Sequence, residues 1–225
     1  VSGKKVKQQV GTQDSLRTPL FRPKAGVVLL SGHTVVPWSL DGTPDISKGW
    51  NEHKLPIIKS AVSDDGRFAV TLCKDLSAVV WDLESGRKRS QFDLDGKYAT
   101  ALCISPDGKF LAGGSRNGEA GVWDIESEKR IKELPGLPNS KGIVATAFSP
   151  DGNWLTGADE NGRLILWDLN AESSTPKTLE SPTPMKVIAL RFLSDSNQIL
   201  TASAGGEVRV WPLDGEPRVV FSVDV

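Results

Sequence analysis

The sequence predicts an all-β fold built from a repeated unit of four antiparallel strands. Three observations lead to this prediction. Tryptophan recurs at positions 38, 81, 123, 167 and 211, at intervals of 42 to 44 residues. A turn containing Asp-Gly precedes it in several copies, as in Ser149-Pro150-Asp151-Gly152. Short apolar runs, typical of strands, lie between these turns and the tryptophans.

The stretch from Thr146 to Leu169 shows the unit most clearly. Its order is an apolar run, a Pro-Asp-Gly turn, a second run, a polar turn with Asn161-Gly162, and a third run that ends in Trp-Asp. Proline fixes φ, aspartate can bond its own backbone two residues on, and glycine accepts a positive φ, so the residues specify the first turn. Asn-Gly belongs to the strongest class of hairpin signal. We therefore expect three strands here, followed by a charged outer strand.

Five copies of the unit can be counted, with expected bounds at about 15–54, 55–96, 97–140, 141–184 and 185–225. The first strand of each copy is apolar on both faces, as expected for a strand that packs between two neighbouring units. The outer strands are rich in Lys and Arg, which prevents edge pairing with other chains. Their basic clusters are therefore interpreted as solvated faces.

The Trp-Asp pairs of three copies, Trp81-Asp82, Trp123-Asp124 and Trp167-Asp168, resemble those of the tryptophan-aspartate (WD) repeat family. Trp38-Ser39 and Trp211-Pro212 depart from that pattern. The resemblance implies a β-propeller in which each repeat forms one four-stranded blade. It also implies that Trp38, Trp123, Trp167 and Trp211 pack between blades. The regular Ser-Pro-Asp-Gly turns are typical of bacterial relatives.

The start of the chain indicates a repeat that precedes the five. Val1 to Lys5 resembles Glu84 to Lys88, which follows a Trp-Asp-Leu. Residues 1–14 are therefore expected to be the outer strand of a preceding blade and a link. Such a strand has no place in a closed ring of five blades. The sequence thus predicts a fragment of a longer propeller, with seven blades as in much of the family.

The family resemblance implies a buried hydrogen-bonded tetrad of histidine, hydroxyl residue, aspartate and tryptophan. By position, the second repeat supplies His53, Thr71, Asp75 and Trp81. These side chains can satisfy one another once buried. The third and fourth repeats have Gly113 and Gly157 in place of the hydroxyl residue, so only the second is predicted to have the full tetrad.

No motif for catalysis or metal binding is complete in the sequence. Gly113 to Gly118 has the glycine spacing of a phosphate loop but no lysine after it. Asp93-Leu94-Asp95-Gly96 lacks the final acidic ligand of a calcium loop. A structural role for His53 is favoured over that of a general base. The sequence predicts no enzyme, no catalytic residues, no metal site and no cofactor.

Composition excludes two other classes of partner. The formal net charge is -1 and the pI is about 6.2, which indicates no general attraction to nucleic acid or to acidic membranes. No apolar run approaches the roughly 18 residues of a membrane span. The sequence leaves the oligomeric state and the compartment open, with a cytoplasmic location favoured.

The function expected from the resemblance is a non-catalytic scaffold for protein–protein interaction. Relatives bind protein or peptide partners through the face that carries the loops before each inner strand and between the second and third strands. Of these positions, Tyr98 with Arg116 is the first choice as a hot spot, because Tyr and Arg are enriched there. The other positions expected on this face are Arg17, Pro56, Ile58, Lys74, Thr100, Gly142, Val144, Glu160, Lys186 and Ile188.

Two alternatives remain open. The array could be the regulatory or targeting arm of a larger multidomain enzyme, for example a kinase, or it could act only as a spacer. Trp50, outside the repeat pattern, either caps the core or lies at a surface where a partner buries it.

Overall fold

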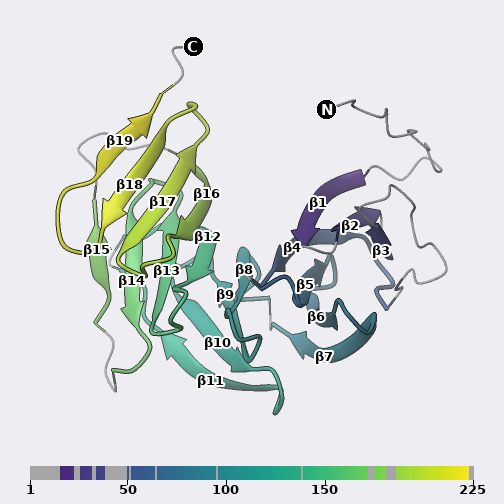
Figure 1. The fold of residues 1–225 in the computed structure, drawn as a ribbon. Coiled ribbons are helices and arrows are strands. Elements are labelled where there is room, and N and C mark those ends of the chain that lie inside the picture. Colours follow the sequence, from purple (N-terminus) through teal and green to yellow (C-terminus); the bar gives the residue numbers. More distant parts are fainter. Residues whose placement is uncertain are drawn as a thin grey trace, which may run out of the picture.

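The computed structural model describes residues 16–22, 26–31, 34–38, 50, 52–63, 65–94, 96–137, 139–171, 175–180 and 186–222. In the first three of these segments it describes the backbone and, among the side chains, Val35. The described residues form 19 strands and no helix, which confirms the all-β prediction (Figure 1). The expected strand within residues 1–14 and the side chains of Arg17 and Trp38 lie outside what is described.

The strands form five antiparallel sheets, each of strands consecutive in sequence. The first sheet has three described strands, β1 (Leu16–Arg22), β2 (Gly26–Ser31) and β3 (Thr34–Trp38). The second and third sheets have four each: β4 (Ile57–Val62), β5 (Phe68–Cys73), β6 (Ser77–Asp82), β7 (Arg87–Asp93), β8 (Ala101–Ile104), β9 (Phe110–Gly114), β10 (Ala120–Asp124) and β11 (Lys129–Leu134). So do the fourth and fifth: β12 (Ile143–Phe148), β13 (Trp154–Asp159), β14 (Leu164–Asp168), β15 (Lys177–Leu179), β16 (Val187–Phe192), β17 (Gln198–Ser203), β18 (Val208–Pro212) and β19 (Arg218–Phe221).

The Asp-Gly turns between first and second strands have the geometry that their residues predict. Asp107 accepts a hydrogen bond from the backbone N–H of Lys109, two residues on, at 3.0 Å. The Ser105 hydroxyl donates to the same carboxylate oxygen at 2.6 Å. Gly108 has a φ of 68°, in the left-handed region that glycine adopts without strain. The degenerate fifth copy keeps this shape with Ser196, at a φ of 58°.

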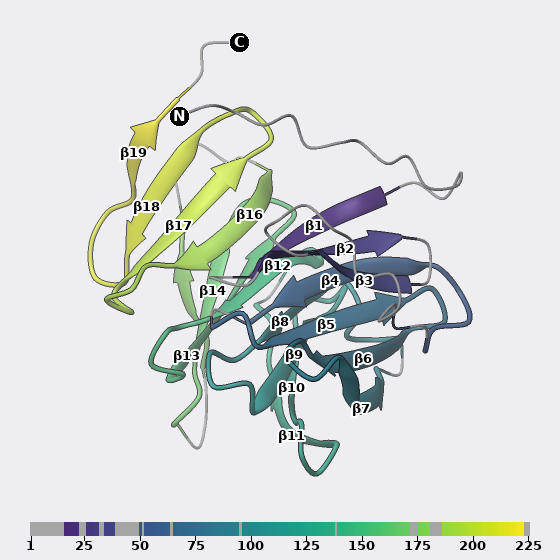
Figure 2. The ribbon, with the colours of Figure 1, turned by 45° about the vertical axis from the view of Figure 1, so that its right-hand side comes forward.

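The sheets follow one another around a central space, with their first strands innermost (Figures 1 and 2). β1 contacts β4, β4 contacts β8, β8 contacts β12, and β12 contacts β16. A cavity of about 380 Å³ between these strands is lined by side chains of β4, β8, β12 and β16. The first strands therefore form the wall of a central channel.

Apolar clusters between neighbouring sheets hold the array together. Trp123 of the third sheet packs with Val70 and Leu72 of the second, and Trp167 of the fourth sheet packs with Ala112 of the third. Trp211 of the fifth sheet packs with Leu164 and Leu166 of the fourth. Each of these tryptophans is at most 5% exposed.

The outer strands are not only solvated faces, because some of their cations tie one sheet to the next. Arg89 of β7 donates to the carbonyl of Gly108 in the third sheet at 2.9 Å. Lys132 of β11 donates to the carbonyl of Leu169, and Lys177 of β15 donates to that of Leu213. The long side chains thus bridge the gap between neighbouring sheets at their outer rim.

Candidate partner-binding face

His53, Thr71 and Trp81 form a buried hydrogen-bonded chain in the second sheet. The Nε1–H of Trp81 donates to the Thr71 hydroxyl oxygen at 2.7 Å, and His53 Nε2 lies 2.7 Å from the same oxygen. All three side chains are at most 4% exposed. His53 therefore holds the Thr71 hydroxyl against the indole of Trp81 inside the second sheet.

Asp75, the fourth residue of the expected tetrad, differs from the expectation in its burial. It lies exposed in the turn between β5 and β6. Its Oδ1 accepts hydrogen bonds from the backbone N–H and the hydroxyl of Ser77, at 3.0 and 2.7 Å. These bonds lower the pKa of the carboxyl, with a smaller electrostatic contribution from His53. The prediction of a buried carboxylate is wrong because a local turn orients it at the surface.

The tryptophans of the fourth and fifth sheets also donate a hydrogen bond through the indole N–H. In the fifth sheet, Trp211 donates to the hydroxyl of Thr201 at 2.8 Å, ten residues apart as in the second sheet. That spacing was readable in the sequence and was missed. In the fourth sheet, where Gly157 replaces the hydroxyl residue, Trp167 donates to the backbone carbonyl of Pro135 at 2.8 Å.

Trp50 caps the core. Its ring stacks on that of Trp81 with centroids 5.6 Å apart, and it is 8% exposed. Its backbone exchanges two hydrogen bonds with Val35 of β3, each of 3.0 Å. Trp50 therefore joins the first sheet to the second.

Tyr98 is not available to a partner. Its side chain is fully buried, and its ring lies edge-on against Trp123 with centroids 5.4 Å apart. Its hydroxyl donates to Glu133 of β11. Burial is the main cause that raises its pKa. The prediction of Tyr98 as a hot spot is wrong, because the ring packs inward against Trp123 and its hydroxyl is held by Glu133.

Glu133 receives this hydroxyl together with the ammonium group of Lys97, 2.7 Å away. The hydrogen bond from Lys97 first, and that from Tyr98 second, lower the pKa of Glu133 from 4.5 to about 2.

A carboxyl group whose pKa is lower in the folded than in the unfolded protein stabilises the fold at a pH above its unfolded pKa. That stability is lost as the pH falls through its folded pKa. We expect Glu133→Gln to destabilise the protein at pH 7 and the difference from wild type to shrink between pH 4.5 and 2. Urea unfolding at several pH values measures this. The exposed Glu126→Gln is the control, and a pH-independent difference for Glu133→Gln would contradict the assignment.

The loop face is the end of the molecule where the first strands begin. There the turns between second and third strands lie beside those starts. The backbone N–H of Lys74 donates to the carbonyl of Pro56 at 3.0 Å, and that of Ala204 donates to the carbonyl of Lys186 at 2.9 Å. The backbone N–H of Ile143 donates to the carbonyl of Ser115 in the neighbouring sheet at 2.9 Å. Backbone bonds thus fix the two sets of loops together, within the second and fifth sheets and between the third and fourth sheets.

A recurring irregularity shapes the first strands at this face. The pairing register shifts between Ile57 and Lys59 in β4, and at the same point near the starts of β12 and β16. Such a bulge inserts an extra residue and re-aims its neighbours. Ile58 and Lys59 are consecutive, yet both are exposed. The bulge therefore brings an apolar and a cationic side chain to the mouth of the channel together.

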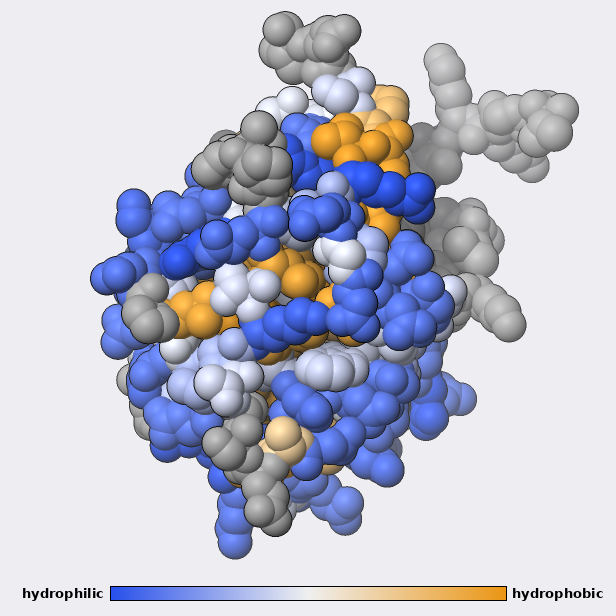
Figure 3. All heavy atoms as spheres, turned by 90° about the vertical axis from the view of Figure 1, so that its left-hand side faces the viewer, coloured by the Kyte–Doolittle hydropathy of each residue, from blue (hydrophilic) through white to orange (hydrophobic). Residues whose placement is uncertain are grey.

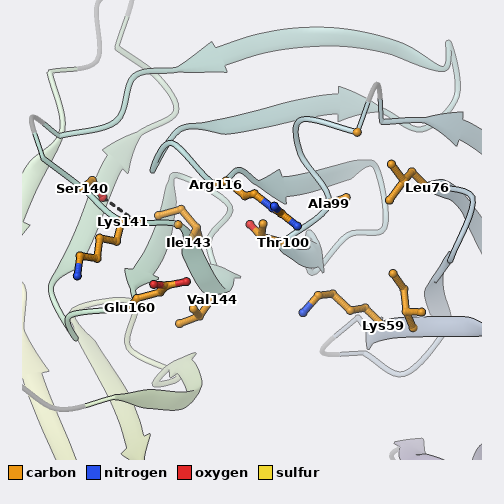
Figure 4. Close-up of a pocket in the computed structure, with 13 residues that line it drawn as sticks. Lys59, Leu76, Ala99, Thr100, Arg116, Ser140, Lys141, Ile143, Val144 and Glu160 are labelled. Atoms are coloured by element: carbon orange, nitrogen blue, oxygen red, sulfur yellow. Dashed lines mark hydrogen bonds between the residues drawn. The ribbon is translucent and has the colours of Figure 1, made fainter.

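A pocket of about 970 Å³ opens at the loop face between the second, third and fourth sheets (Figure 4). It brings together three of the residues expected to contact partners, Thr100, Arg116 and Glu160. It is also lined by Ile58, Gly142 and Val144, which were expected on this face. Lys74 and Lys186 are exposed but do not line it.

The sequence interpretation missed seven lining residues, which are Lys59, Leu76, Gly96, Ala99, Ser140, Lys141 and Ile143. Strict alternation along β4 separates Lys59 from Ile58, and only the bulge places both at the pocket. Lys141 directly precedes Gly142, which was expected on the loop face, so the sequence did contain a signal for the position of Lys141.

The cationic ends of Arg116 and Lys59 extend into the pocket from two sides, and the carboxylate of Glu160 extends into it from a third (Figure 4). Salt bridges occur elsewhere in the sheets, but none joins these groups among the described residues. The same residues include no group of three or more His, Cys, Asp and Glu side chains placed to hold a metal ion. Nor do they include a helix with the length and apolarity of a membrane span.

Comparison with models of protein families gives a match to the repeats. The family model described as "WD domain, G-beta repeat" matches residues 89–124, 129–168 and 174–212, which together make up just over half of the chain. None of the curated proteins matches the chain in sequence. The three matched ranges end at or next to the ends of β10, β14 and β18.

Proposed function

Because this chain belongs to the WD-repeat family, we propose that it is a non-catalytic platform that binds protein or peptide partners through the loop face around its channel. Repeats of this family generally mediate protein–protein interaction. The observation that supports the loop face is the pocket of about 970 Å³, into which residues from three sheets converge. A volume of this size lies at the upper end of the range of ligand pockets, roughly 300 to 1,000 Å³.

Photocrosslinking tests this proposal. A photoreactive residue in place of Glu160, at the pocket, is expected to crosslink to a defined partner band in extracts of the source cells. The same residue in place of Lys129, exposed on the outer strand β11, is the matched control. Arg116→Glu, combined with the probe at Glu160, should remove the band. Equal crosslinking from both sites, or a band unaffected by Arg116→Glu, would contradict the loop face as the partner-binding surface.

We further propose that the five sheets belong to a longer propeller, of seven blades and of bacterial type. Support comes from the outward face of the fifth sheet. Phe221 lies opposite Val208 as Phe92 lies opposite Ala78, yet Phe221 is 58% exposed and Phe92 is 3% exposed. Val219 and Val220 of the same strand are also exposed, and apolar surface is visible on this side of the molecule (Figure 3). A further blade would cover these side chains, as the third sheet covers Phe92.

Electron microscopy of the protein encoded by the complete gene tests this by counting blades. Seven blades support the proposal, and a closed ring of five contradicts it. The alternative that the array is the regulatory or targeting arm of a larger enzyme stays a prediction. The sequence of the complete gene tests it, because a fused catalytic domain would be visible there.

A further inference from the structure

The cations of the loop-face pocket differ from several others in the sheets because no described residue is their anionic partner. Lys88, Lys97 and Lys177 pair with carboxylates at 2.7 to 3.1 Å. Arg163 pairs with the fully buried Asp159 at 2.8 Å. Lys59, Arg116 and Lys141 have no ion pair among the described residues, although all three line one pocket.

The charge of the pocket is therefore positive. Among the described residues, its lining carries three cations and one carboxylate, that of Glu160. Like charges gathered in a concave site focus the potential and favour a ligand of opposite sign. Complementary charge raises the rate of encounter and selects among partners. The ligand that fits this pocket is an anion.

The hydroxyl of Thr100 adds a second polar group to the same lining. Its Oγ1 is enclosed and has no hydrogen-bond partner among the described residues. It lies beside the side chain of Arg116 (Figure 4). An enclosed polar atom without a partner costs free energy. A carboxylate that reaches Arg116 can accept a hydrogen bond from Thr100 as well.

The lining also includes aliphatic side chains. Ile58 is 43% exposed at the pocket mouth, and Leu76 and Val144 contribute further apolar surface. None of the described lining residues has an aromatic side chain. Single-stranded nucleic acids bind basic grooves through stacking on aromatic rings, so this lining favours an aliphatic side chain beside the anionic groups over a base.

We propose that the loop-face pocket binds an acidic peptide segment of a partner protein, with Asp or Glu side chains on Arg116 and Lys59. An adjacent aliphatic side chain packs on Ile58 and Val144. Arginine can hold a carboxylate through two parallel hydrogen bonds, which fixes the orientation of the segment. This inference rests on the proposed function and adds to it the chemical class of the partner.

Selection from a displayed library of random twelve-residue peptides tests the proposal. We expect the protein to enrich peptides with two or more Asp or Glu residues next to Leu, Ile or Val. The most enriched peptide, labelled with fluorescein, is then titrated by anisotropy. Arg116→Glu and Lys59→Glu should each weaken its binding about tenfold or more, because reversal adds repulsion to the lost attraction. Lys129→Glu, with the same charge change on the outer strand, should leave binding unchanged.

Raising the salt concentration should also weaken binding of the peptide to the wild-type protein, because the Debye length falls from about 10 Å at 0.1 M to about 3 Å at 1 M.

Enrichment of neutral or basic peptides whose binding still needs the pocket would overturn the acidic class of the partner but leave the interaction platform intact. Equal loss of binding in Lys129→Glu and the pocket variants would overturn the assignment to this pocket. No enrichment, or binding of fluorescein-labelled oligo-uridylate in place of peptide, would overturn the proposal as well. The photocrosslinking result then decides whether the platform itself stands.

Discussion

Substitution of Trp81 by alanine is expected to lower the free energy of unfolding by about 4 to 5 kcal/mol, at the upper end for core truncations. Trp81 is 1% exposed and packs in the cluster between the first and second sheets. Its removal leaves a cavity, takes away the stacking partner of Trp50 and deprives the Thr71 hydroxyl of its indole donor. These losses act at one position and add to the loss of buried apolar area.

Urea denaturation followed by tryptophan fluorescence and by circular dichroism measures the change. Thr71→Val serves as a graded control, because it removes the hydroxyl of the chain while it keeps the volume, and it should cost about 1 to 3 kcal/mol. If Trp81→Ala lowered the free energy of unfolding by less than about 2 kcal/mol, both the burial of Trp81 and its hydrogen bond to Thr71 would be contradicted.

Gly113→Ala is expected to destabilise the protein by about 3 kcal/mol, the cost of strong overpacking. A Cβ at this position would lie 2.5 Å from the backbone oxygen of Tyr98 and 3.4 Å from the ring of Trp123. The backbone oxygen cannot move aside as a flexible side chain can. The methyl group would therefore force β8 and β9 apart at the start of the first strand.

Gly205→Ala is the matched control, because the nearest atom to its Cβ would be Ser203 Oγ at 3.9 Å. Thermal unfolding of both variants compares them. Equal melting temperatures would contradict the close approach of Tyr98 to Gly113. Restored stability in a double variant with a smaller residue at Tyr98 would not be expected, since the clash is with the backbone.

The sequence predicted the fold class because the repeated features are local. The Pro-Asp-Gly and Asn-Gly turns specify their own backbone geometry, and the hydrogen bonds of Asp107 and Asp151 two residues on are those expected. The predicted grouping into four-stranded antiparallel sheets followed from the period and is confirmed for four sheets of the described residues. The prediction that the carboxylate of Asp75 is buried was wrong, because its hydrogen bonds with Ser77 in a local turn orient it at the surface.

The candidate site was only partly predictable. Thr100, Arg116 and Glu160 were expected by position on the loop face, and the structure gathers them in one pocket. Tyr98 was expected beside them, but its ring is buried edge-on against Trp123 and its hydroxyl bonds Glu133 of β11. Lys59 was missed, because the bulge in β4 changes the alternation and leaves no mark in the sequence.

The sequence by itself determined the repeat, its turns and the apolar tryptophan between units, since each depends on residues close together in the chain. The tertiary structure alone decided which charges are paired. Lys97 meets Glu133, 36 residues away, while Lys59, Arg116 and Lys141 come from three sheets into one pocket without a carboxylate partner among the described residues. Pairing depends on distances between side chains of different sheets, and those distances are set only when the sheets pack around the channel.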